Sequence, residues 1–442
     1  MLVNIRKLLL IFLILVGKNT LQAQEAWTLA QCVDTAQVHN KSLQINRNII
    51  ALGEQREKEA KANLIPKIAV NADYKYFTDL PHQLMPLSTF NPTAPEGQFK
   101  DAQFGVPHNI NANLQLAMPL YNQQLHGAIH NTKLASKLTE LQYQKTEEQV
   151  LYDVTTLYYN AQILIHQLSF LDSNLINTNK LSQNMQLLHE QLVVKGTDVN
   201  KVKLQAEQLK TQKEKVSNKY VQILNALKLN MGIALSQSVS VENDIQLQVA
   251  KAYSPNTILD LQIVQTQNKL LNTELSTLNK SKYIPSLNLI ASYGTSGFGY
   301  NKSPNEFLNF YPIGFAGIQL NYPLFNGTVT QRKIYQKRLE IINNDLQSQL
   351  ISEKNKMEIE NANRQRAVAQ KTVANTDDQI QLAHTIYEQT ILQLKQGTAT
   401  LTDVLLADNA LREAQQNYLS ATIDYLKADL DLRKLSGNMR EN

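Results

Sequence analysis

Few side chains of this chain have the types and spacing that chemistry requires. His126 and His130 stand one helical turn apart, where two imidazoles can share a metal ion, but the glutamate of a zinc-protease helix is missing. Cys32 is the only cysteine, so neither an internal disulfide nor a cysteine metal cluster can form. No phosphate-binding glycine loop and no nucleophile elbow occurs. We therefore predict no catalytic residue, no metal site, no cofactor and no enzymatic activity.

Glycine and threonine occur together in two turns between stretches of helical pattern, at Gly196–Thr197 and Gly397–Thr398. Because glycine adopts a positive φ without strain, both turns are predicted to reverse the chain between two helices. The next aspartate, Asp198 or Asp403, stands four residues closer to the glycine in the first turn than in the second. This difference predicts that the two helical hairpins do not reach equally far.

Three aspartates near these turns are the acidic residues of interest, namely Asp198, Asp403 and Asp408. Asp198 and Asp403 come near predicted helix N-termini, where the helix dipole favours a carboxylate. A structural role in the first helical turn explains Asp198 as well as a functional role does.

The placement of glycine and proline predicts very long helices. The tract between Gly127 and Gly196 has 68 residues without either residue type, and the tract between Gly327 and Gly397 has 69. Each tract is predicted to be one helix of about 100 Å, with apolar residues spaced by three and four as in coiled coils. The shorter helices are predicted to stack end to end in pairs alongside a long one. Helices are predicted over 26–65, 122–195, 198–231, 256–284, 327–396 and 398–436.

Four short segments alternate between apolar and polar residues, as β-strands do. One such strand would as readily cover a soluble core, but the polar positions hold Asn, Gln and Ser, which suits a watery lumen. Ile290 and Phe315 break the alternation. Strands are predicted over 67–77, 109–118, 286–293 and 313–322, with long loops of extracellular character over 78–108 and 294–312. Transitions between strands and helices are predicted at Pro66, Pro119, Pro285 and Pro323.

The chain repeats itself. The segment from Pro66 resembles the segment from Pro285, and the segment from Met118 resembles that from Tyr322. The predicted fold is therefore mainly α with a small β part, built from two units of helix, strand, strand, long helix and helix. The repeats are predicted over 24–232 and 255–437, with a linker over 233–254 and a short tail over 438–442.

The first residues predict export from the cytoplasm. Arg6 and Lys7 precede an apolar run, and small residues near Ala23 complete a secretory signal over 1–23. No later segment has enough consecutive apolar residues for a membrane-spanning helix. Without the signal the chain has 40 basic and 38 acidic residues, so its charge gives no indication of nucleic-acid binding. Four strands cannot close a channel, and open edges are not tolerated in lipid, so a barrel shared between subunits is predicted.

The duplicated plan and its local motifs resemble the TolC family of outer-membrane efflux proteins over essentially the whole chain after the signal. The motifs are Trp27-Thr28-Leu29-x-x-Cys32-Val33, the Pro-Leu-aromatic-Asn signals at 119–122 and 323–326, and Gly397-Thr398-x4-Asp403-Val404-Leu405.

The resemblance implies a homotrimer that forms a periplasmic α-barrel tunnel topped by a twelve-stranded transmembrane β-barrel. Such a duct sits in the lipid of the outer membrane of a Gram-negative bacterium and extends into the periplasm. It passively conducts substrates that an inner-membrane transporter of the RND or ABC class delivers through a periplasmic adaptor protein.

The resemblance also implies roles for the turns. Gly196, Thr197, Gly397 and Thr398 would form the hairpin tips that contact the adaptor. Asp403 matches the family position of an acidic ring at the periplasmic gate, and Asp198 and Asp408 are further gate candidates. In the family pattern a second acid follows three residues later, where this chain has Leu406.

Two other interpretations stay open. A periplasmic coiled-coil adaptor or scaffold without a pore would share the long hairpins, although it has no need of four strands with Asn-rich faces. A secreted enzyme would need a convergent polar site, which the sequence does not reveal.

Overall fold

The structure, a computed structural model, describes residues 26–245, 252–254, 256–304 and 306–440, so the predicted signal segment lies outside it. The chain forms two compact units. The helical unit is the described part of Met1–Ile49, Glu140–Ile263 and Ser348–Asn442, and the sheet unit is that of Ile50–Thr139 and Val264–Gln347.

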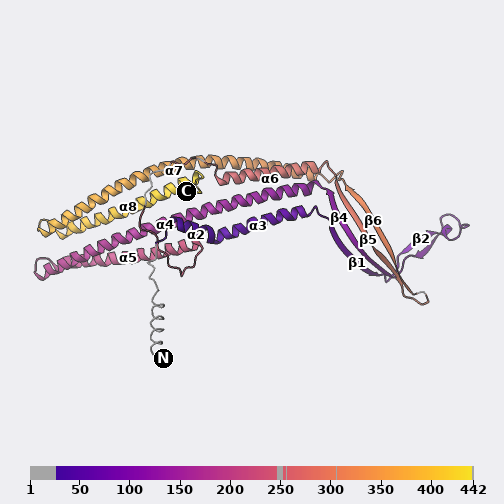
Figure 1. Cartoon of the computed structure of the whole chain (residues 1–442), viewed down its shortest axis with the longest axis horizontal. Coiled ribbons are helices and arrows are strands. Elements are labelled where there is room, and N and C mark those ends of the chain that lie inside the picture. The colour runs from indigo at the N-terminus through magenta and orange to yellow at the C-terminus, as the bar shows by residue number, and fades with distance from the viewer. Residues whose placement is uncertain (1–25, 246–251, 255, 305, 441–442) are drawn as a thin grey trace, which may run out of the picture. The chain divides into compact units, whose positions relative to one another are not determined.

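The two predicted long helices are present. Helix α4 (Gln123–Glu190) has 68 residues and helix α7 (Val329–Lys395) has 67, so each extends for about 100 Å. Helix α5 (Gly196–Met231) follows α4 and helix α8 (Leu401–Leu435) follows α7, which gives the two helical hairpins of Figure 1. The shorter helix α6 (Leu259–Ser281) precedes the second pair of strands.

The first helix differs from its prediction, because 26–65 contains two helices instead of one. Helix α2 (Leu29–His39) ends at Asn40, and helix α3 (Lys41–Ala62) begins directly after it. Asn40 has an extended ψ of 128°, and its side-chain Oδ1 accepts a hydrogen bond of 3.1 Å from the Leu43 backbone N–H. An asparagine that caps the following turn in this way interrupts an otherwise regular helix.

In each half of the chain two shorter helices meet end to end, as predicted: α5 meets α3, and α8 meets α6. In the first half, the side chain of Asn40 donates a hydrogen bond of 2.6 Å to the carbonyl of Asn230 at the end of α5. In the second half, the Asn256 backbone N–H donates to the Ser436 carbonyl at 2.9 Å. Gly232 and Gly437 follow α5 and α8 with φ of 74° and 71°, a conformation that glycine allows. A side chain at Gly232 would place its Cβ 2.1 Å from the His39 carbonyl oxygen.

The single cysteine lies in the core of the helical unit, near the place where Asn40 contacts the end of α5. Cys32 and Ala36 of α2 are fully buried against Val154 of α4 and Leu227 of α5. Burial disfavours the thiolate and raises the pKa of the Cys32 thiol to about 12. At this position the cysteine is a small apolar packing residue.

The sheet unit contains one antiparallel sheet of four strands in the order β1-β4-β5-β6, called the main sheet below. The strands are β1 (Lys67–Tyr76), β4 (His108–Tyr121), β5 (Ser286–Tyr300) and β6 (Phe307–Asn321). The register confirms the predicted alternation, because Asn71 faces Asn113 while Val70 faces Leu114. One face is therefore rich in amides and the other in apolar side chains.

Three of the strands are longer than predicted. The predicted loop 294–312 is mostly strand, since β5 continues to Tyr300 and β6 begins at Phe307. Its glycines looked like loop residues, but Gly297 lies beneath an aromatic ring of the neighbouring strand: a Cβ there would lie 2.6 Å from the ring of Phe310. Pro312 is accommodated because β6 is an edge strand.

The other predicted loop, 78–108, contains a separate two-stranded ribbon. It consists of β2 (His82–Pro86) and β3 (Phe99–Gln103), joined through the 3-10 turn Leu87–Thr89 and the following residues.

Three of the four prolines that were predicted at transitions between strands and helices lie at such transitions. Pro66 lies between α3 and β1, Pro285 between α6 and β5, and Pro323 between β6 and α7. Pro119 instead lies inside β4, opposite Asn288, where the register against β5 shifts. A bulge near a strand end tolerates a residue without an N–H, so this transition was predicted two residues too early.

Among the helices of the described residues, none is long and apolar enough to cross a membrane.

Candidate functional site

The second hairpin tip has the geometry that the sequence predicted. Gly397 has a φ of 76°, and its N–H donates to the Leu394 carbonyl at 3.1 Å. The N–H of Thr398 donates to the Gln393 carbonyl at 3.0 Å, which completes a Schellman motif at the end of α7. Gly397 and Thr398 are exposed at this turn.

The first tip uses the same motif, but not the predicted glycine. Leu192 has a φ of 62° and donates to His189, while Val193 donates to Leu188, both at 2.9 Å. Gly196, predicted to make the turn, is the first residue of α5 and is followed there by the exposed Thr197. Leu192 stands 205 positions before Gly397, and Asp198 stands 205 before Asp403. The two turns therefore have equal length, which removes the basis of the prediction of unequal reach, because that prediction was counted from Gly196.

The positive φ of Leu192 leads to a prediction about the stability of the protein. A side chain at positive φ costs about 1–2 kcal/mol, and Leu192 is 90% exposed, so its packing does not offset this cost. We expect Leu192→Gly to raise the free energy of unfolding by about 1 kcal/mol. The reciprocal control Gly397→Leu should lower it by a similar amount. Thermal melting of the helical circular dichroism signal in detergent measures both, and equal midpoints for the two variants would contradict the assignment.

Asp403 closes a capping box at the start of α8. Its Oδ2 accepts hydrogen bonds from the backbone N–H of Thr400 at 2.8 Å and from the Thr400 hydroxyl at 2.7 Å. These bonds stabilise the ionised form and lower the pKa of the carboxyl group. Asp403 is exposed and therefore presents a negative charge at the tip.

Asp198 occupies the equivalent position of α5 in a different setting. The residue before α5 is Lys195, which makes no side-chain cap, so no capping box forms. The carboxylate of Asp198 instead forms an ion pair of 3.1 Å with Lys201 one turn along α5. This pairing favours the structural interpretation of Asp198 that the sequence left open.

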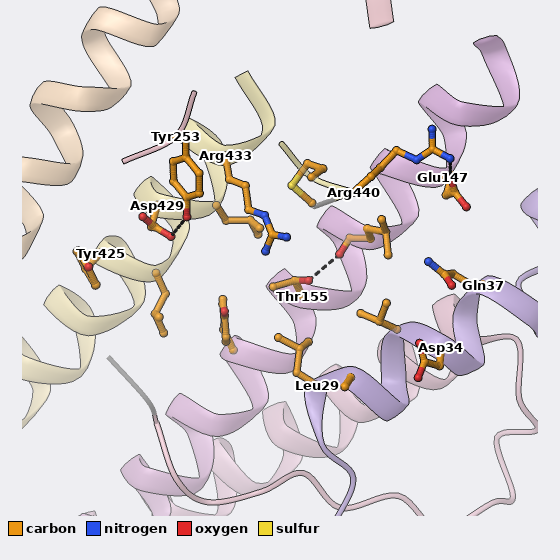
Figure 2. A pocket seen from close by; sticks show the side chains of 17 residues that line it. Leu29, Asp34, Gln37, Glu147, Thr155, Tyr253, Tyr425, Asp429, Arg433 and Arg440 are labelled. Carbon is orange, nitrogen blue, oxygen red and sulfur yellow. Dashed lines mark hydrogen bonds and ion pairs between the residues drawn. The ribbon is translucent and has the colours of Figure 1, made fainter. Parts of the chain in front are cut away.

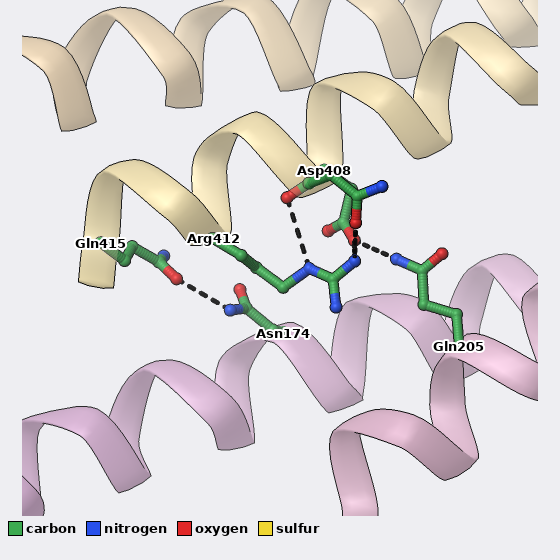
Figure 3. A network of polar contacts seen from close by, with 6 residues as sticks. Asn174, Gln205, Asp408, Arg412 and Gln415 are labelled. Carbon is green, nitrogen blue, oxygen red and sulfur yellow. Dashed lines mark hydrogen bonds and ion pairs between the residues drawn. The ribbon is translucent and has the colours of Figure 1, made fainter. Parts of the chain in front are cut away.

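Asp408 lies away from the exposed tip surface. Its side chain is buried, 3.0 Å from the guanidinium of Arg412, and accepts a hydrogen bond from Gln205 of α5. Figure 3 shows these three residues between α5 and α8, with Gln415 of α8 bonded at 2.8 Å to Asn174 of α4. Burial raises the pKa of the Asp408 carboxyl group, although Arg412 and Gln205 oppose that shift.

This buried network joins the two hairpins of one chain. Gln205, Asn174 and Gln415 were not predicted, because nothing in a single sequence indicates which helices face each other. The i,i+4 spacing of Asp408 and Arg412 was the one available signal.

The amide-rich face of the main sheet is the second polar surface of interest. Asn71 Nδ2 donates to Gln115 Oε1 at 3.1 Å, and Asn111 Nδ2 donates to Asp73 Oδ2 at 3.3 Å. The hydroxyl of Ser296 donates to Asn111 Oδ1 at 2.9 Å. The amides thus form a cross-strand network over β1, β4 and β5.

A cavity of about 590 Å³ lies between α2, α4, α8 and the linker (Figure 2). Of its polar groups, Asp429 accepts from Tyr253 at 2.7 Å and pairs with Arg366 of α7 at 2.9 Å, and Glu147 pairs with Arg440 at 2.7 Å. We infer that these bonds around the cavity attach the linker to the hairpins. Within the described ranges, no group of three or more His, Cys, Asp and Glu side chains is arranged to bind a metal ion.

Comparison with known proteins gives consistent matches. A family model described as outer membrane efflux protein matches residues 271–438. The chain is 21% identical to outer membrane protein TolC of Salmonella enteritidis over 463 aligned residues, which cover 99% of this chain and 87% of that protein. Among solved structures, VceC of Vibrio cholerae has a TM-score of 0.72 at 15% identity, covering 92% of this chain and 96% of VceC. CusC has a TM-score of 0.74 at 13% identity, covering 92% of each chain. These two likenesses show the fold.

Proposed function

Starting from a chain that resembles the outer membrane efflux proteins in motifs, in sequence and in fold, we propose that it is the exit duct of a tripartite efflux or secretion system. The comparisons confirm the family resemblance and the outer-membrane location that the sequence predicted. In the proposed role the protein passively conducts substrates to the exterior, and an inner-membrane partner supplies the energy.

The observation that carries this proposal is the main sheet with its two open edges. Strands β1 and β6 each have a single neighbour among the described strands, and nearly all of their residues are exposed in one chain. Unpaired backbone groups are not tolerated in lipid, so the sheet needs further copies to close into a barrel. Three copies of four strands give the proposed twelve-stranded barrel, with the amides lining a watery lumen.

An exposed apolar stripe on α7 supports the same assembly. Its residues follow the spacing of a coiled-coil seam and are each more than half exposed in the single chain. We call this set the α7 stripe: Leu339, Ile342, Leu346, Leu350 and Met357. A neighbouring copy in a homotrimer would cover it, which favours the duct over a monomeric scaffold.

The hairpin tips are the proposed contact surface for the periplasmic adaptor. Leu192 and Val193 are exposed at the first tip, and Gly397 and Thr398 at the second. An adaptor docked here would connect the duct to an inner-membrane transporter of the RND or ABC class. The rival interpretation, an adaptor or scaffold without a pore, gives no role to the amphipathic main sheet.

Cell fractionation and bilayer recording test the proposal together. We expect an outer-membrane oligomer that is retained on unboiled gels and lost on boiling. The purified oligomer should conduct ions across a planar lipid bilayer. A soluble periplasmic monomer, or an outer-membrane oligomer that does not conduct, would refute the exit duct.

Asp403 is the proposed gate residue, because its exposed carboxylate stays ionised and three copies would meet at the tunnel entrance. We expect Asp403→Ala to raise the concentration of a trivalent cation that half-blocks conductance from the periplasmic side by about tenfold. The matched control is Asp198→Ala, whose carboxylate is already paired with Lys201 and should leave the block unchanged. Equal shifts in the two variants would assign the block to general surface charge.

A further inference from the structure

The amide-rich face of the main sheet also carries large apolar side chains on β5 and β6, and three of them follow one another along β6. Directly paired residues in an antiparallel sheet project from the same face. The paired rows across the sheet are Asp73, Asn111, Ser296 and Tyr311; Asn71, Asn113, Gly294 and Ile313; and Ala69, Gln115, Ser292 and Phe315. We call Tyr311, Ile313 and Phe315 the β6 row.

Side-chain contacts agree with this assignment of faces. Ser296 pairs with Tyr311 and donates its hydroxyl hydrogen to the amide oxygen of Asn111, so Tyr311 and Asn111 share a face. The ring of Phe298 lies 6.1 Å from that of Tyr311, as expected for diagonal neighbours on one face. On the opposite face, the ring of Phe310 covers Gly297.

The β6 row is open to solvent in the single chain. Tyr311, Ile313 and Phe315 are 54%, 59% and 58% exposed. Across the sheet lie hydroxyl and amide groups of β4 and β5. A flat apolar surface next to hydrogen-bonding groups can bind solutes that present both kinds of group.

This part of the face is also nearly free of charge. The charged side chains of the four main strands are Lys67, Asp73 and Lys75, and all three belong to β1. Asp73 and Lys75 form an ion pair of 3.4 Å with each other. Within one chain, the β6 row and the groups nearest to it therefore offer stacking and hydrogen bonding, and the charged side chains lie at the opposite edge of the sheet.

We propose that the β6 row and the neighbouring amides form a contact track in the lumen for uncharged solutes that combine a flat apolar ring with hydroxyl groups, such as aryl glycosides. The inference rests on the proposed function, which makes the amide-rich face the lumen side. The ring of the solute stacks on Tyr311 or Phe315, and its hydroxyl groups bond to Asn111, Ser296 or Gln115. Three copies would place three such tracks around the lumen.

The test uses the full-length oligomer in a planar bilayer with 4-nitrophenyl maltoside as the probe. We expect the probe to reduce ion conductance reversibly, and maltose, which lacks the ring, to do so less. In the variant that combines Tyr311→Leu with Phe315→Leu, the apolar character is kept and the flat rings are lost. The half-blocking concentration, measured against each variant's own conductance without probe, should then rise about tenfold. The control is Phe99→Leu on β3, equally exposed but outside the main sheet, and it should behave like the native chain.

The other possible outcomes contradict either the contact track or the exit duct. A conducting native oligomer that the probe does not block, or a leucine variant blocked at the native concentration, overturns the contact track. A leucine variant that no longer forms the oligomer shows that the row packs between copies, which also overturns it. A native chain that conducts no ions overturns the exit duct, and the contact track with it.

Discussion

Placing charges on the α7 stripe should strongly reduce formation of the proposed oligomer. In the variant combining Leu346→Asp and Leu350→Asp, assembly would bury two carboxylates without partners in each copy. Burial of an unpaired charge costs several kcal/mol, so we expect at least about a tenfold loss of the heat-sensitive oligomer and of the protein recovered in the outer membrane. Unboiled gels and fractionation measure both quantities.

The matched control is Gln347→Asp, which adds a charge to the same turn of α7. Gln347 is exposed but stands about 100° around the helix from Leu346, outside the stripe. This variant should assemble normally. If the stripe variant forms as much oligomer as the control, the surface that joins the copies lies elsewhere and the stripe needs another explanation.

Removal of the Asp408 side chain should have the second large effect. Asp408→Ala leaves Gln205 without its acceptor and Arg412 without its carboxylate between two packed hairpins. Loss of one partner from such a buried network costs about 2–4 kcal/mol. We expect faster amide hydrogen exchange at the start of α5 and of α8, measured by mass spectrometry. Asp424→Ala, an exposed aspartate of the same helix, is the control and should not change the exchange.

The variant Asp408→Asn tests the contribution of the hydrogen bonds to stability separately from that of the charge. Because burial raises the pKa of Asp408 above its usual value, folding favours protonation of this group relative to the unfolded chain, and the amide should cost less than the alanine. In the native chain, this group's contribution to stability is greatest below the unfolded pKa and declines as pH rises through the raised folded pKa. The asparagine variant should lack that decline. The idea fails if the Asn and Ala variants are equally destabilised.

Asp403, five residues earlier, has the opposite pH dependence. The Thr400 hydrogen bonds lower its pKa, so its contribution is present above the unfolded pKa and is lost as pH falls through the folded value. Two aspartates of one helix therefore respond to acid in opposite directions, one at the tip surface and one between the hairpins.

The parts of the structure that follow from local rules were predictable. The long helices followed from the absence of glycine and proline, and the main sheet from alternation with a period of two. The predicted strand ends were wrong where glycine had two possible meanings. Gly297 looks like a loop residue until one knows that Phe310 of the paired strand lies over it.

The candidate site was less accessible to sequence reasoning. Leu192 adopts a conformation that propensity disfavours, and the nearby Gly196 offered a more plausible turn residue, so the first tip was placed four residues too late. Asp408 was grouped with Asp403 because the two are neighbours in sequence. Their different roles depend on the contact of Asp408 with Gln205, some 200 residues away in the chain.

The buried position of Cys32 also determines how the tips can be studied. A thiol that is fully enclosed, with a pKa raised to about 12, reacts negligibly with maleimides at neutral pH. A cysteine introduced at Thr398 or Leu192 would then be the sole labelled site of each copy. Spin or fluorophore labels attached there would report distances between the tips of neighbouring subunits without removal of the natural cysteine.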